Sequence, residues 1–564
     1  MNKRSVFSLA LVVSLLGLLS FSVEIQNAHA PYLIIMIMAD GYISPPSANI
    51  TTADNVTYTF TADINASIIV QRSNIVIDGN GWTLNGVDFT IWEGFNVTDV
   101  SNVTITNVNI ERFASYSIYL ESAALCVLSD NTVTGSEGGI GLFSSTGNTV
   151  SNNLIAGCSE AIELVSASGN VVSGNNLSDS STGVYGFNST DNAISENSIK
   201  ANTQGIYLGS SSNFNTVTRN NITANTNDGI SLWYSSNITV SENQIRNNFN
   251  CIRIWMSSGI QIIENDLMEN NHGIALGGNS CSLYRNDIQV EYIGIDIFGS
   301  YNIISRNNIT NCGTGFFFGG NSIHNVVSGN TVTDNTFALY FEQAYNNSIV
   351  ENYLAGNTYG IYLDWYSYNM RIYHNTFNHN KNPMTFPNPS NPNFLDNGVE
   401  GNYRSDYTGV DLNHDGIGDT PHIINANNTD HYPLMGPFHR FNTSLGKSIN
   451  LISNSTVDGF EYESPGMIRF TVSNTTQNQT HGFCRVTIPY EALSTPFNVT
   501  IDGANPTYWN YTVYNNGTHN WIYFEYAHST KEIMIIPESP SLLVLPLFMT
   551  VSLVAALVYG RKRS

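Results

Sequence analysis

The sequence predicts an all-β protein whose main body is a right-handed parallel β-helix of about 12 to 13 coils. Three observations lead to this prediction. A small residue followed by an apolar residue recurs at spacings of 21 to 24 residues. Each repeat has room for three short strands and three turns, and none for a helix. Asparagines stand at matching turn positions in successive repeats. A β-sandwich and a C-terminal transmembrane helix are predicted to follow the β-helix.

The recurring pair marks the first strand of each coil. The twelve pairs begin at Ser117, Gly139, Ala161, Gly183, Gly205, Gly229, Cys251, Gly273, Gly294, Gly315, Ala338 and Gly360. A repeat of about 22 residues indicates stacked units, because one unit alone cannot bury its apolar face. Apolar residues then alternate with others, as in Ile206-Tyr207-Leu208. This alternation points the first and third side chains inward and the middle one outward.

Two columns of asparagine mark the turns, with Asn148 and Asn170 in one and Asn153 and Asn175 in the other. Asparagine tolerates left-handed turn geometry, and its amide can bond to the next coil. We therefore expect these columns to be structural. Five of the six cysteines, Cys126, Cys158, Cys251, Cys281 and Cys312, stand where other coils have small buried residues or turn asparagines. Each is expected to be a buried thiol, with no disulfide inside the helix.

The predicted domain organisation follows from the repeat and from composition at the two ends. The boundaries are a signal peptide at 1–30, an N-terminal cap at 31–90, the β-helix at 91–400, an Asp/Asn/Gly-rich cap at 401–440, a β-sandwich at 441–536 and a transmembrane anchor with a basic tail at 537–564. The sandwich is predicted from alternating apolar and polar residues between turn signals such as Asp502-Gly503.

Both ends of the chain predict export. Lys3 and Arg4 precede an apolar run and the cleavage pattern Ala28-His29-Ala30, which is typical of a signal peptide. The apolar run 542–559 is just long enough to span a bilayer, and the basic residues after it are expected to stay cytoplasmic. Nineteen Asn-x-Ser/Thr sequons are consistent with a glycoprotein. We predict a cell-surface protein anchored in the membrane.

The charge balance limits the class of partner. The chain has 44 acidic and 21 basic residues, for a net charge of −23. Nucleic-acid binding requires clustered Lys and Arg, so this class of partner is excluded. Neutral or cationic partners and bound metal ions remain.

One segment of the C-terminal cap has the pattern of a calcium loop. Oxygen-bearing side chains alternate along it, with glycine at the sixth position. The predicted ligands of a structural Ca²⁺ are the side chains of Asp411, Asn413, Asp415 and Asp419 and the carbonyl of Ile417. The loop is not an EF-hand, because its twelfth position is His422 rather than Glu. The same residues also suit a turn that holds no metal.

The cap and the coils together resemble a known family. The cap contains Gly401-Asn402-Tyr403, the loop that begins at Asp411, and Asp430-His431-Tyr432-Pro433. With the 22-residue coils and the segment 76–84, it resembles the NosD-like right-handed β-helix proteins, which share the CASH repeat. That family usually has Trp where this chain has Arg404. The resemblance implies the β-helix fold over about residues 40–440. The tail after Pro537 resembles archaeal surface-protein anchors.

Outward positions of the first strand carry a stripe of aromatic residues. Exposed aromatics in a row are typical of a binding surface, and Tyr and Trp suit sugars because they combine a flat apolar face with a polar edge. The predicted ligand-binding residues are Tyr185, Phe187, Tyr207, Trp233, Arg253, Trp255, Asp296 and Phe298. The sequence thus favours a non-enzymatic protein that binds a polysaccharide or surface glycan. The same stripe is also expected if the rings only stack on one another as a ladder.

Two other functions remain open. A polysaccharide lyase or glycoside hydrolase needs carboxylates close together, and Glu342 and Asp364 stand at equivalent positions of consecutive coils. The NosD-like resemblance implies a copper-related periplasmic role as a further alternative. Copper prefers Met, Cys and His ligands, and histidines such as His374, His379 and His431 stand in or near the cap.

Overall fold

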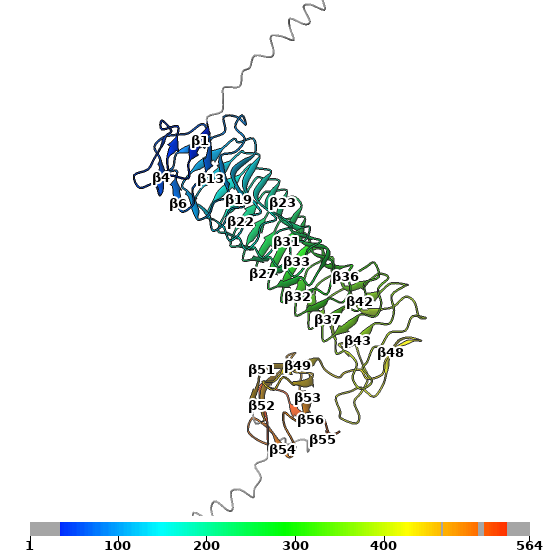
Figure 1. Cartoon of the computed structure of the whole chain (residues 1–564). Coiled ribbons are helices and arrows are strands. Elements are labelled where there is room, and N and C mark those ends of the chain that lie inside the picture. The colour runs from blue at the N-terminus through cyan, green and yellow to red at the C-terminus, as the bar shows by residue number, and fades with distance from the viewer. Residues whose placement is uncertain (1–33, 464–465, 506–511, 538–564) are drawn as a thin grey trace, which may run out of the picture. The chain divides into compact units, whose positions relative to one another are not determined.

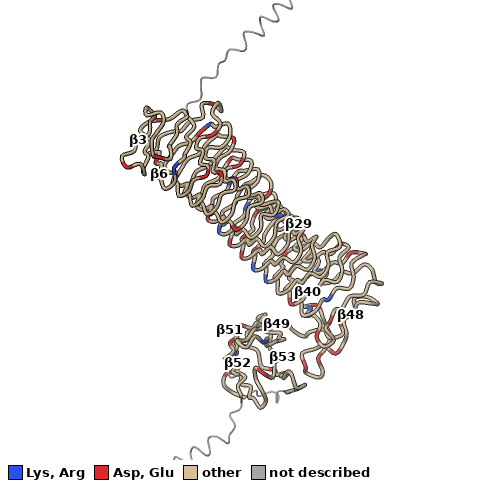
Figure 2. The backbone as a smooth tube through the Cα atoms, in the orientation of Figure 1, with Lys and Arg blue, Asp and Glu red and all other residues tan. Residues whose placement is uncertain are grey.

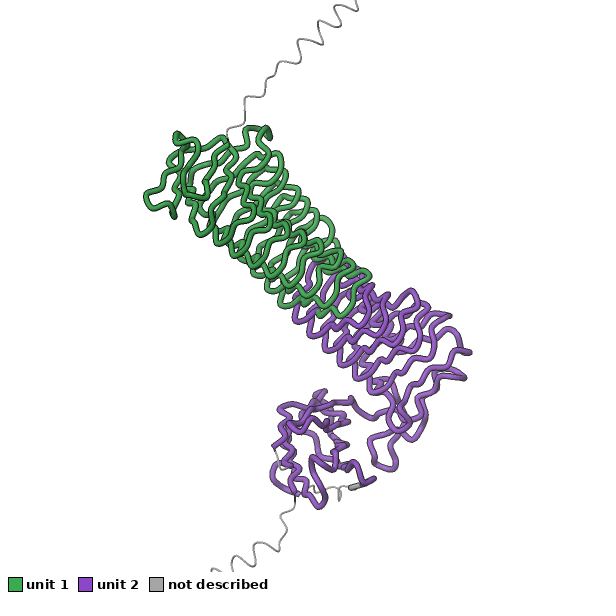
Figure 3. Tube along the Cα trace, in the orientation of Figure 1, with its two compact units in different colours: residues 1–261 green, residues 262–564 purple. Residues whose placement is uncertain are grey.

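The computed structural model describes residues 34–463, 466–505 and 512–537 (Figure 1). These residues form strands joined by turns and contain no helix. None of them therefore belongs to a helix long and apolar enough to cross a membrane. The predicted signal peptide and the apolar run 542–559 lie outside the described residues. The chain divides into two compact units, residues 1–261 and 262–564 (Figure 3).

The first unit is built from three series of short parallel strands. The first series comprises β1 (Ile34–Ile37), β5 (Ser67–Val70), β8 (Phe95–Thr98), β11 (Tyr116–Glu121), β14 (Gly138–Phe143), β17 (Glu160–Val165), β20 (Thr182–Phe187), β23 (Gln204–Gly209), β26 (Asp228–Trp233) and β29 (Asn250–Ser258). The second comprises β4 (Thr57–Phe60), β6 (Ile75–Asp78), β9 (Val103–Thr106), β12 (Val127–Ser129), β15 (Thr149–Ser151), β18 (Val171–Ser173), β21 (Ala193–Ser195), β24 (Thr216–Thr218) and β27 (Thr239–Ser241). The third comprises β7 (Thr83–Asn85), β10 (Asn109–Glu111), β13 (Thr132–Thr134), β16 (Leu154–Ala156), β19 (Asn176–Ser178), β22 (Ser198–Lys200), β25 (Asn221–Thr223) and β28 (Gln244–Arg246). Two short antiparallel strands, β2 (Ile43–Ser44) and β3 (Ile50–Thr51), pair with β1 and β4.

The β-helix has about 15 turns, more than the 12 to 13 predicted. The difference arises at the N-terminus, where residues 34–85 already supply parallel strands to all three series. There Ile68 pairs with Phe95, which lies 27 residues later in the chain. This spacing exceeds the 22-residue repeat, so counting the repeat missed these early coils.

The core follows the predicted alternation. In β23, Ile206 and Leu208 are buried and Tyr207 between them is partly exposed. Each inward side chain stacks on its counterpart one coil away, as Ile206 does on Ile230. Burial of one such column in every strand series is the main source of stability, at roughly 25 cal/mol for each Å² of apolar surface removed from water. The five cysteines of the coils are buried, as predicted, and so is Cys484 in the C-terminal sheets.

The asparagine columns form continuous hydrogen-bonded ladders. The backbone N–H and the side-chain Nδ2 of Asn170 both donate to Oδ1 of Asn192, at 2.9 and 3.0 Å. Its Nδ2 also donates to the carbonyl of Ser145, at 3.0 Å. Its own Oδ1 accepts two bonds from Asn148. Each buried amide thus connects three coils, and the structural role predicted for these columns is confirmed.

The second unit begins with the same three series. Its first series is β31 (Asp266–Asn279), β33 (Asp287–Ile297), β36 (Thr314–Phe318), β39 (Phe337–Phe341), β42 (Tyr359–Leu363) and β45 (Asn382–Thr385). The second is β32 (Ser282–Tyr284), β34 (Ile303–Ser305), β37 (Val326–Ser328), β40 (Ser348–Val350) and β43 (Arg371–Tyr373), with β30 (Gln261–Ile263) at the unit boundary. The third is β35 (Asn308–Thr310), β38 (Thr331–Thr333), β41 (Tyr353–Ala355), β44 (Thr376–Asn378) and β46 (Tyr403–Arg404). In β31 and β33 the third strand of one coil runs into the first strand of the next, because no turn separates them.

The residues after the last coil form a hairpin and two antiparallel sheets. The hairpin pairs β47 (His422–Asn425) with β48 (Asn428–Asp430). The five-stranded sheet has the order β49 (Phe438–Asn442), β50 (Ser448–Ser453), β53 (His481–Pro489), β56 (His519–Ala527) and β55 (Thr512–Asn515). The four-stranded sheet has the order β51 (Thr456–Glu463), β52 (Met467–Ser473), β57 (Lys531–Pro537) and β54 (Phe497–Ile501). Buried residues of both sheets, such as Leu451 and Phe470, share one apolar core.

Candidate functional site

The aromatic stripe of the first unit starts on β20 and β23. Tyr185 and Tyr207 stand opposite each other in register, and their ring centroids are 5.2 Å apart at an interplanar angle of 9°. Phe187, two residues after Tyr185, is 41% exposed. It stands opposite Gly209, which has no side chain to cover it. These two coils therefore present stacked and open aromatic faces to solvent.

The stripe is densest on β26 and β29. Trp233 stands opposite Trp255, with ring centroids 6.2 Å apart. The Arg253 guanidinium carbon lies 5.7 Å from the centroid of the Trp233 ring, which is within the range of a cation–π contact. Nε1 of Trp233 donates to the Ser231 hydroxyl at 2.8 Å. Trp255 is 39% exposed. The geometry thus combines two indole rings and one cation on a single outward face.

Asp296 and Phe298, the other two predicted ligand-binding residues, belong to the second unit. Asp296 lies on β33, between Ala275 and Phe317 of the neighbouring strands. Phe298 is 45% exposed and contacts Phe317 edge to face, with ring centroids 6.3 Å apart. Burial beside these apolar neighbours raises the pKa of Asp296 to about 7. Its Oδ1 is buried and has no hydrogen-bond partner among the described residues.

A tyrosine–carboxylate pair on the same face of the first unit was not predicted. The hydroxyl of Tyr116 on β11 donates to Oε2 of Glu163 on β17, two coils away. The Tyr116 ring crosses Gly138 and Gly141, where any Cβ atom would collide with it. Burial is the main cause that raises the pKa of Glu163. The signal in the sequence is these two glycines, which open the space for a ring from the preceding coil.

The two predicted catalytic carboxylates occupy turn positions. Glu342 and Asp364 directly follow β39 and β42, whose last residues, Phe341 and Leu363, pair in register. Oδ1 of Asp364 accepts hydrogen bonds from the backbone N–H of Tyr366 and the hydroxyl of Ser367. Asp364 therefore stabilises its own turn. Glu342 is exposed, and no contact joins the two carboxylates in the described structure.

The predicted calcium ligands lie in one loop, where their oxygens accept hydrogen bonds from the loop itself. Asp411 accepts from the backbone N–H groups of Asp415 and Gly416, at 3.1 and 2.8 Å. Asp419 accepts from the backbone N–H of Leu412, at 2.6 Å. Burial is the main cause that raises the pKa of Asp411. The carboxylate of Asp415 accepts from Nδ2 of Asn413 at 3.2 Å and from the backbone N–H of Ile417 at 2.9 Å, and Asn413 and Ile417 are the other two predicted ligands. Calcium binding at this loop stays a prediction.

The histidines considered for copper have other partners. Nε2 of His374 lies 2.8 Å from Oε2 of Glu400, and Nδ1 of His431 lies 3.0 Å from Oδ2 of Asp396. Within the described part of the chain, no three His, Cys, Asp or Glu side chains are grouped so as to hold a metal ion. Arg404, where the NosD-like proteins usually have Trp, donates to both carboxylate oxygens of Asp406.

Comparison with known proteins places the fold. The family model for the right-handed β-helix region matches residues 93–245 and 250–429, which is more than half of the chain. The chain belongs to the right-handed β-helix family. No curated protein matches it. The finer resemblance of this β-helix protein to NosD-like and archaeal surface proteins stays a prediction.

Several solved structures are similar to parts of this chain at low sequence identity. The periplasmic alginate epimerase AlgG is 13% identical, with a TM-score of 0.40 over 54% of this chain and 80% of that one. PfbA, a surface adhesin of Streptococcus pneumoniae, is 9% identical, with a TM-score of 0.38 over 53% and 84%. A mutant tailspike protein of E. coli bacteriophage HK620, in complex with a hexasaccharide, is 10% identical, with a TM-score of 0.35 over 86% and 85%. The assignment to the family rests on the family model alone.

Proposed function

We propose that this β-helix protein binds carbohydrate or other envelope components at the cell surface through the aromatic stripe of its first unit, without catalysing a reaction. The observation that carries the proposal is the group formed by Trp233, Arg253 and Trp255. It places two indole rings and a guanidinium on one outward face. An indole ring offers a flat apolar surface on which the C–H face of a sugar can stack. The guanidinium offers hydrogen-bond donors for hydroxyl or acidic groups.

The arrangement of the stripe suits an extended ligand. Coils repeat about every 4.8 Å along the stack, so the aromatic positions recur at a short and regular spacing. Tyr185 and Tyr207 continue the aromatic face on the two coils that precede Trp233. A polysaccharide that ran along the stack would meet an aromatic side chain on each of these coils. Ladder stacking alone would also produce this pattern, so binding has to be measured.

Glycan-array screening of the full-length chain tests the proposal. The double variant Trp233→Ala/Trp255→Ala is compared with the unaltered chain. Loss of both rings is expected to weaken binding by about 2 kcal/mol or more, roughly 30-fold, as is typical of a buried aromatic anchor. Trp92→Ala is the matched control, because Trp92 is 69% exposed in the same unit and lies outside the stripe. Unchanged binding by the double variant, or no glycan bound by the unaltered chain, would reject the stripe as the site.

The placement of the protein is part of the proposal. We infer that residues 1–30 direct export and that the run 542–559 holds the chain in the membrane. The two antiparallel sheets with one shared core support a β-sandwich stalk between the β-helix and the membrane. Protease treatment of intact cells that express the full chain tests this placement. Cleavage from outside is expected to release the β-helix, and protection of the whole chain would refute it.

A polysaccharide-cleaving enzyme is the second candidate, favoured by the Tyr116–Glu163 pair. A general acid must be protonated at the working pH, and burial moves Glu163 in that direction. The hydrogen bond from Tyr116 lowers the pKa of Glu163 in part, and Glu160, on the same strand, raises it, so that the net shift is upward. Release of reducing sugar from a polysaccharide panel would support this function if Glu163→Gln abolished it and Glu342→Gln did not. If the unaltered chain releases no sugar from any polysaccharide, the enzymatic candidate is excluded.

A further inference from the structure

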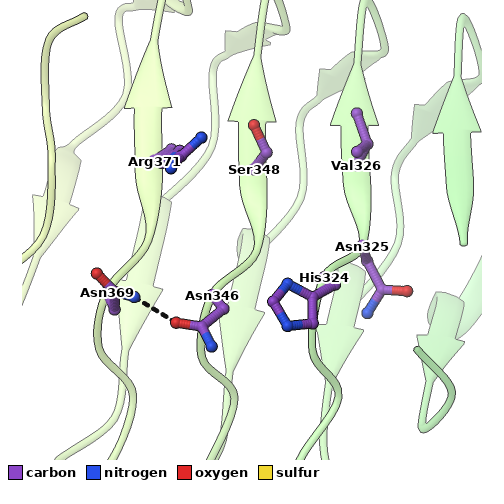
Figure 4. A pocket seen from close by; sticks show the side chains of 7 residues that line it. All are labelled: His324, Asn325, Val326, Asn346, Ser348, Asn369 and Arg371. Carbon is purple, nitrogen blue, oxygen red and sulfur yellow. Dashed lines mark hydrogen bonds between the residues drawn. The ribbon is translucent and has the colours of Figure 1, made fainter. Parts of the chain in front are cut away.

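Three hollows lie in the second unit, over the end of its second strand series and the residues that follow it. The first hollow has a volume of about 420 Å³ and lies over β37, β40 and β43 (Figure 4). Val326, Ser348 and Arg371 form its strand side, one on each of these strands (Figure 4). The turns that precede these strands form the other side, through His324, Asn325, Asn346 and Asn369.

The polar groups of this hollow are suited to an acidic ligand. None of its lining residues is a carboxylate. Arg371 is exposed, and no described carboxylate pairs with its guanidinium. The amide of Asn369 donates to Oδ1 of Asn346, so the amide nitrogen of Asn346 is the end of this lining side chain that can donate to a ligand (Figure 4). In a chain with a net charge of −23, an unpaired cation in a hollow without acids is a distinctive feature.

Aromatic rings stand on the same turns as these donors, and one of them, His324, lines the hollow. The ring of His324 stacks on Tyr301, with centroids 5.1 Å apart at 24°, and Tyr301 is 59% exposed. Tyr345 and Tyr368, which directly precede Asn346 and Asn369, stack at 5.2 Å and 8°. Flat apolar faces next to hydrogen-bond donors suit a sugar ring better than a small inorganic anion.

The hollow continues into two others, which gives the site length. Arg371 also lines a second hollow, together with Phe394 and Asp396. Phe394 and Asp396 in turn line a third hollow with His431. Asp396 accepts hydrogen bonds from the backbone N–H and the ring Nδ1 of His431, so its carboxylate already has partners there. The shared lining residues make the three hollows neighbours, and we call the three together the trough.

We propose that this trough binds an anionic sugar chain, with Arg371 holding a carboxylate or sulfate group and the turn residues His324 and Asn346 bonding neighbouring hydroxyls. Arginine is suited to this role because its planar guanidinium can bond a carboxylate or sulfate through two parallel N–H groups. The site is distinct from the aromatic stripe and does not depend on the function proposed for it. It assigns an acidic class of ligand to a face of the protein that carries few aromatic residues on its strands.

Isothermal titration of the full-length chain with hexagalacturonate, a sulfated hexasaccharide and neutral maltohexaose tests the inference. The protein is made in a host that attaches no N-glycans, because Asn346 belongs to a sequon. We expect binding of at least one acidic hexamer and not of maltohexaose, with affinity that falls as salt is added. Arg371→Gln is expected to weaken that binding by about 10- to 100-fold, the range for loss of a hydrogen bond to a charged group. Val326→Trp, which fills the hollow and keeps the charge, is expected to weaken it as well.

Two control variants separate binding in the trough from a general charge effect and from binding at the aromatic stripe. Arg285→Gln removes one exposed arginine of the same unit outside the trough, where it pairs with Glu264, and is expected to leave binding unchanged. An equal loss of acidic-hexamer affinity in Arg285→Gln and Arg371→Gln would overturn the inference. The inference would also be overturned if sodium sulfate bound as tightly as the hexamers. The Trp233→Ala/Trp255→Ala variant is expected to retain acidic-hexamer binding. If it loses that binding while Arg371→Gln keeps it, the trough is refuted and the stripe is supported.

Discussion

Asp296 offers a direct test of the structure, because it is a half-buried carboxylate that stands between apolar neighbours. On β33 it stands between Ala275 and Phe317, and its Oδ1 has no hydrogen-bond partner among the described residues. Burial raises its pKa from an ordinary value of 3.8 to about 7. The change to test is Asp296→Asn, which keeps the shape of the side chain and removes its charge. We expect this variant to be more stable than the unaltered chain at pH 8.

The magnitude follows from proton linkage. Because the folded-state pKa is raised, the folded protein binds more protons than the unfolded protein between about pH 4 and pH 7. Stability therefore falls as the pH rises through this window. Each tenfold change in the dissociation constant corresponds to about 1.4 kcal/mol, so the full effect would be roughly 4 kcal/mol. Asp296 is partly accessible to solvent, which screens the charge, and we expect about 2 kcal/mol.

The assay compares Asp296→Asn with the unaltered chain at pH 4 and pH 8. Denaturant unfolding gives the free-energy difference, and hydrogen exchange of the peptides from β31, β33 and β36 shows whether the change is local to these coils. We expect a gain of about 2 kcal/mol at pH 8 and almost none at pH 4. An equal effect at the two pH values, or a loss of stability at pH 8, would refute the inference that Asp296 is half-buried and without a partner.

Three further predictions concern the rest of the chain. Asn170→Ala breaks one ladder and leaves buried N–H and C=O groups unpaired, so its free energy of unfolding is expected to be about 3 kcal/mol lower. The control is Asn188→Ala, at an exposed turn, which is expected to change the free energy of unfolding by less than about 0.5 kcal/mol. Glu400→Gln removes a carboxylate whose pKa burial raises but whose hydrogen bond to His374 lowers, with a net lowering. Because the folded-state pKa is lowered, the stability that Glu400 provides at neutral pH is expected to fall as acid is added. An acid titration followed by tryptophan fluorescence is therefore expected to show less pH dependence in the variant. Calcium is expected to raise the thermal midpoint of unfolding of the full-length chain and to release heat on titration. Asp415→Ala is expected to abolish both effects. Equal heats for the two proteins would contradict the predicted site.

The fold was predictable because its signals are local and repeated. The small–apolar pair, the alternation after it and the asparagine columns recur in every coil, so each coil gives the same information again. The asparagines bond to the same position one coil later, as Asn170 does to Asn192, and a column in the sequence therefore becomes a ladder in space. The first coils escaped prediction because Ile68 and Phe95, which pair, are separated by a longer loop than the repeat allows.

The candidate sites were only partly predictable, because their geometry depends on how far a side chain reaches across coils. The pairing of Trp233 with Trp255 follows directly from the repeat. The contact between Tyr116 and Glu163 does not, since it passes over an intervening coil and requires glycines there. The burial of Asp296 also could not be read from its outward position, because it depends on the Phe317 ring of the next coil.

The structure also limits where function can lie on this protein. Inward positions are filled by stacked apolar side chains, and the turn columns by asparagines whose amides are already bonded, so neither set is available to a ligand. Charged residues are sparse along the chain, and most of the tube in Figure 2 carries none. Charged side chains at outward positions, such as Asp296 and Arg371, are therefore uncommon on this surface. Asp296 is expected to lower stability at neutral pH, and Arg371 has no ion-pair partner among the described residues, so the stability of the fold explains neither of them.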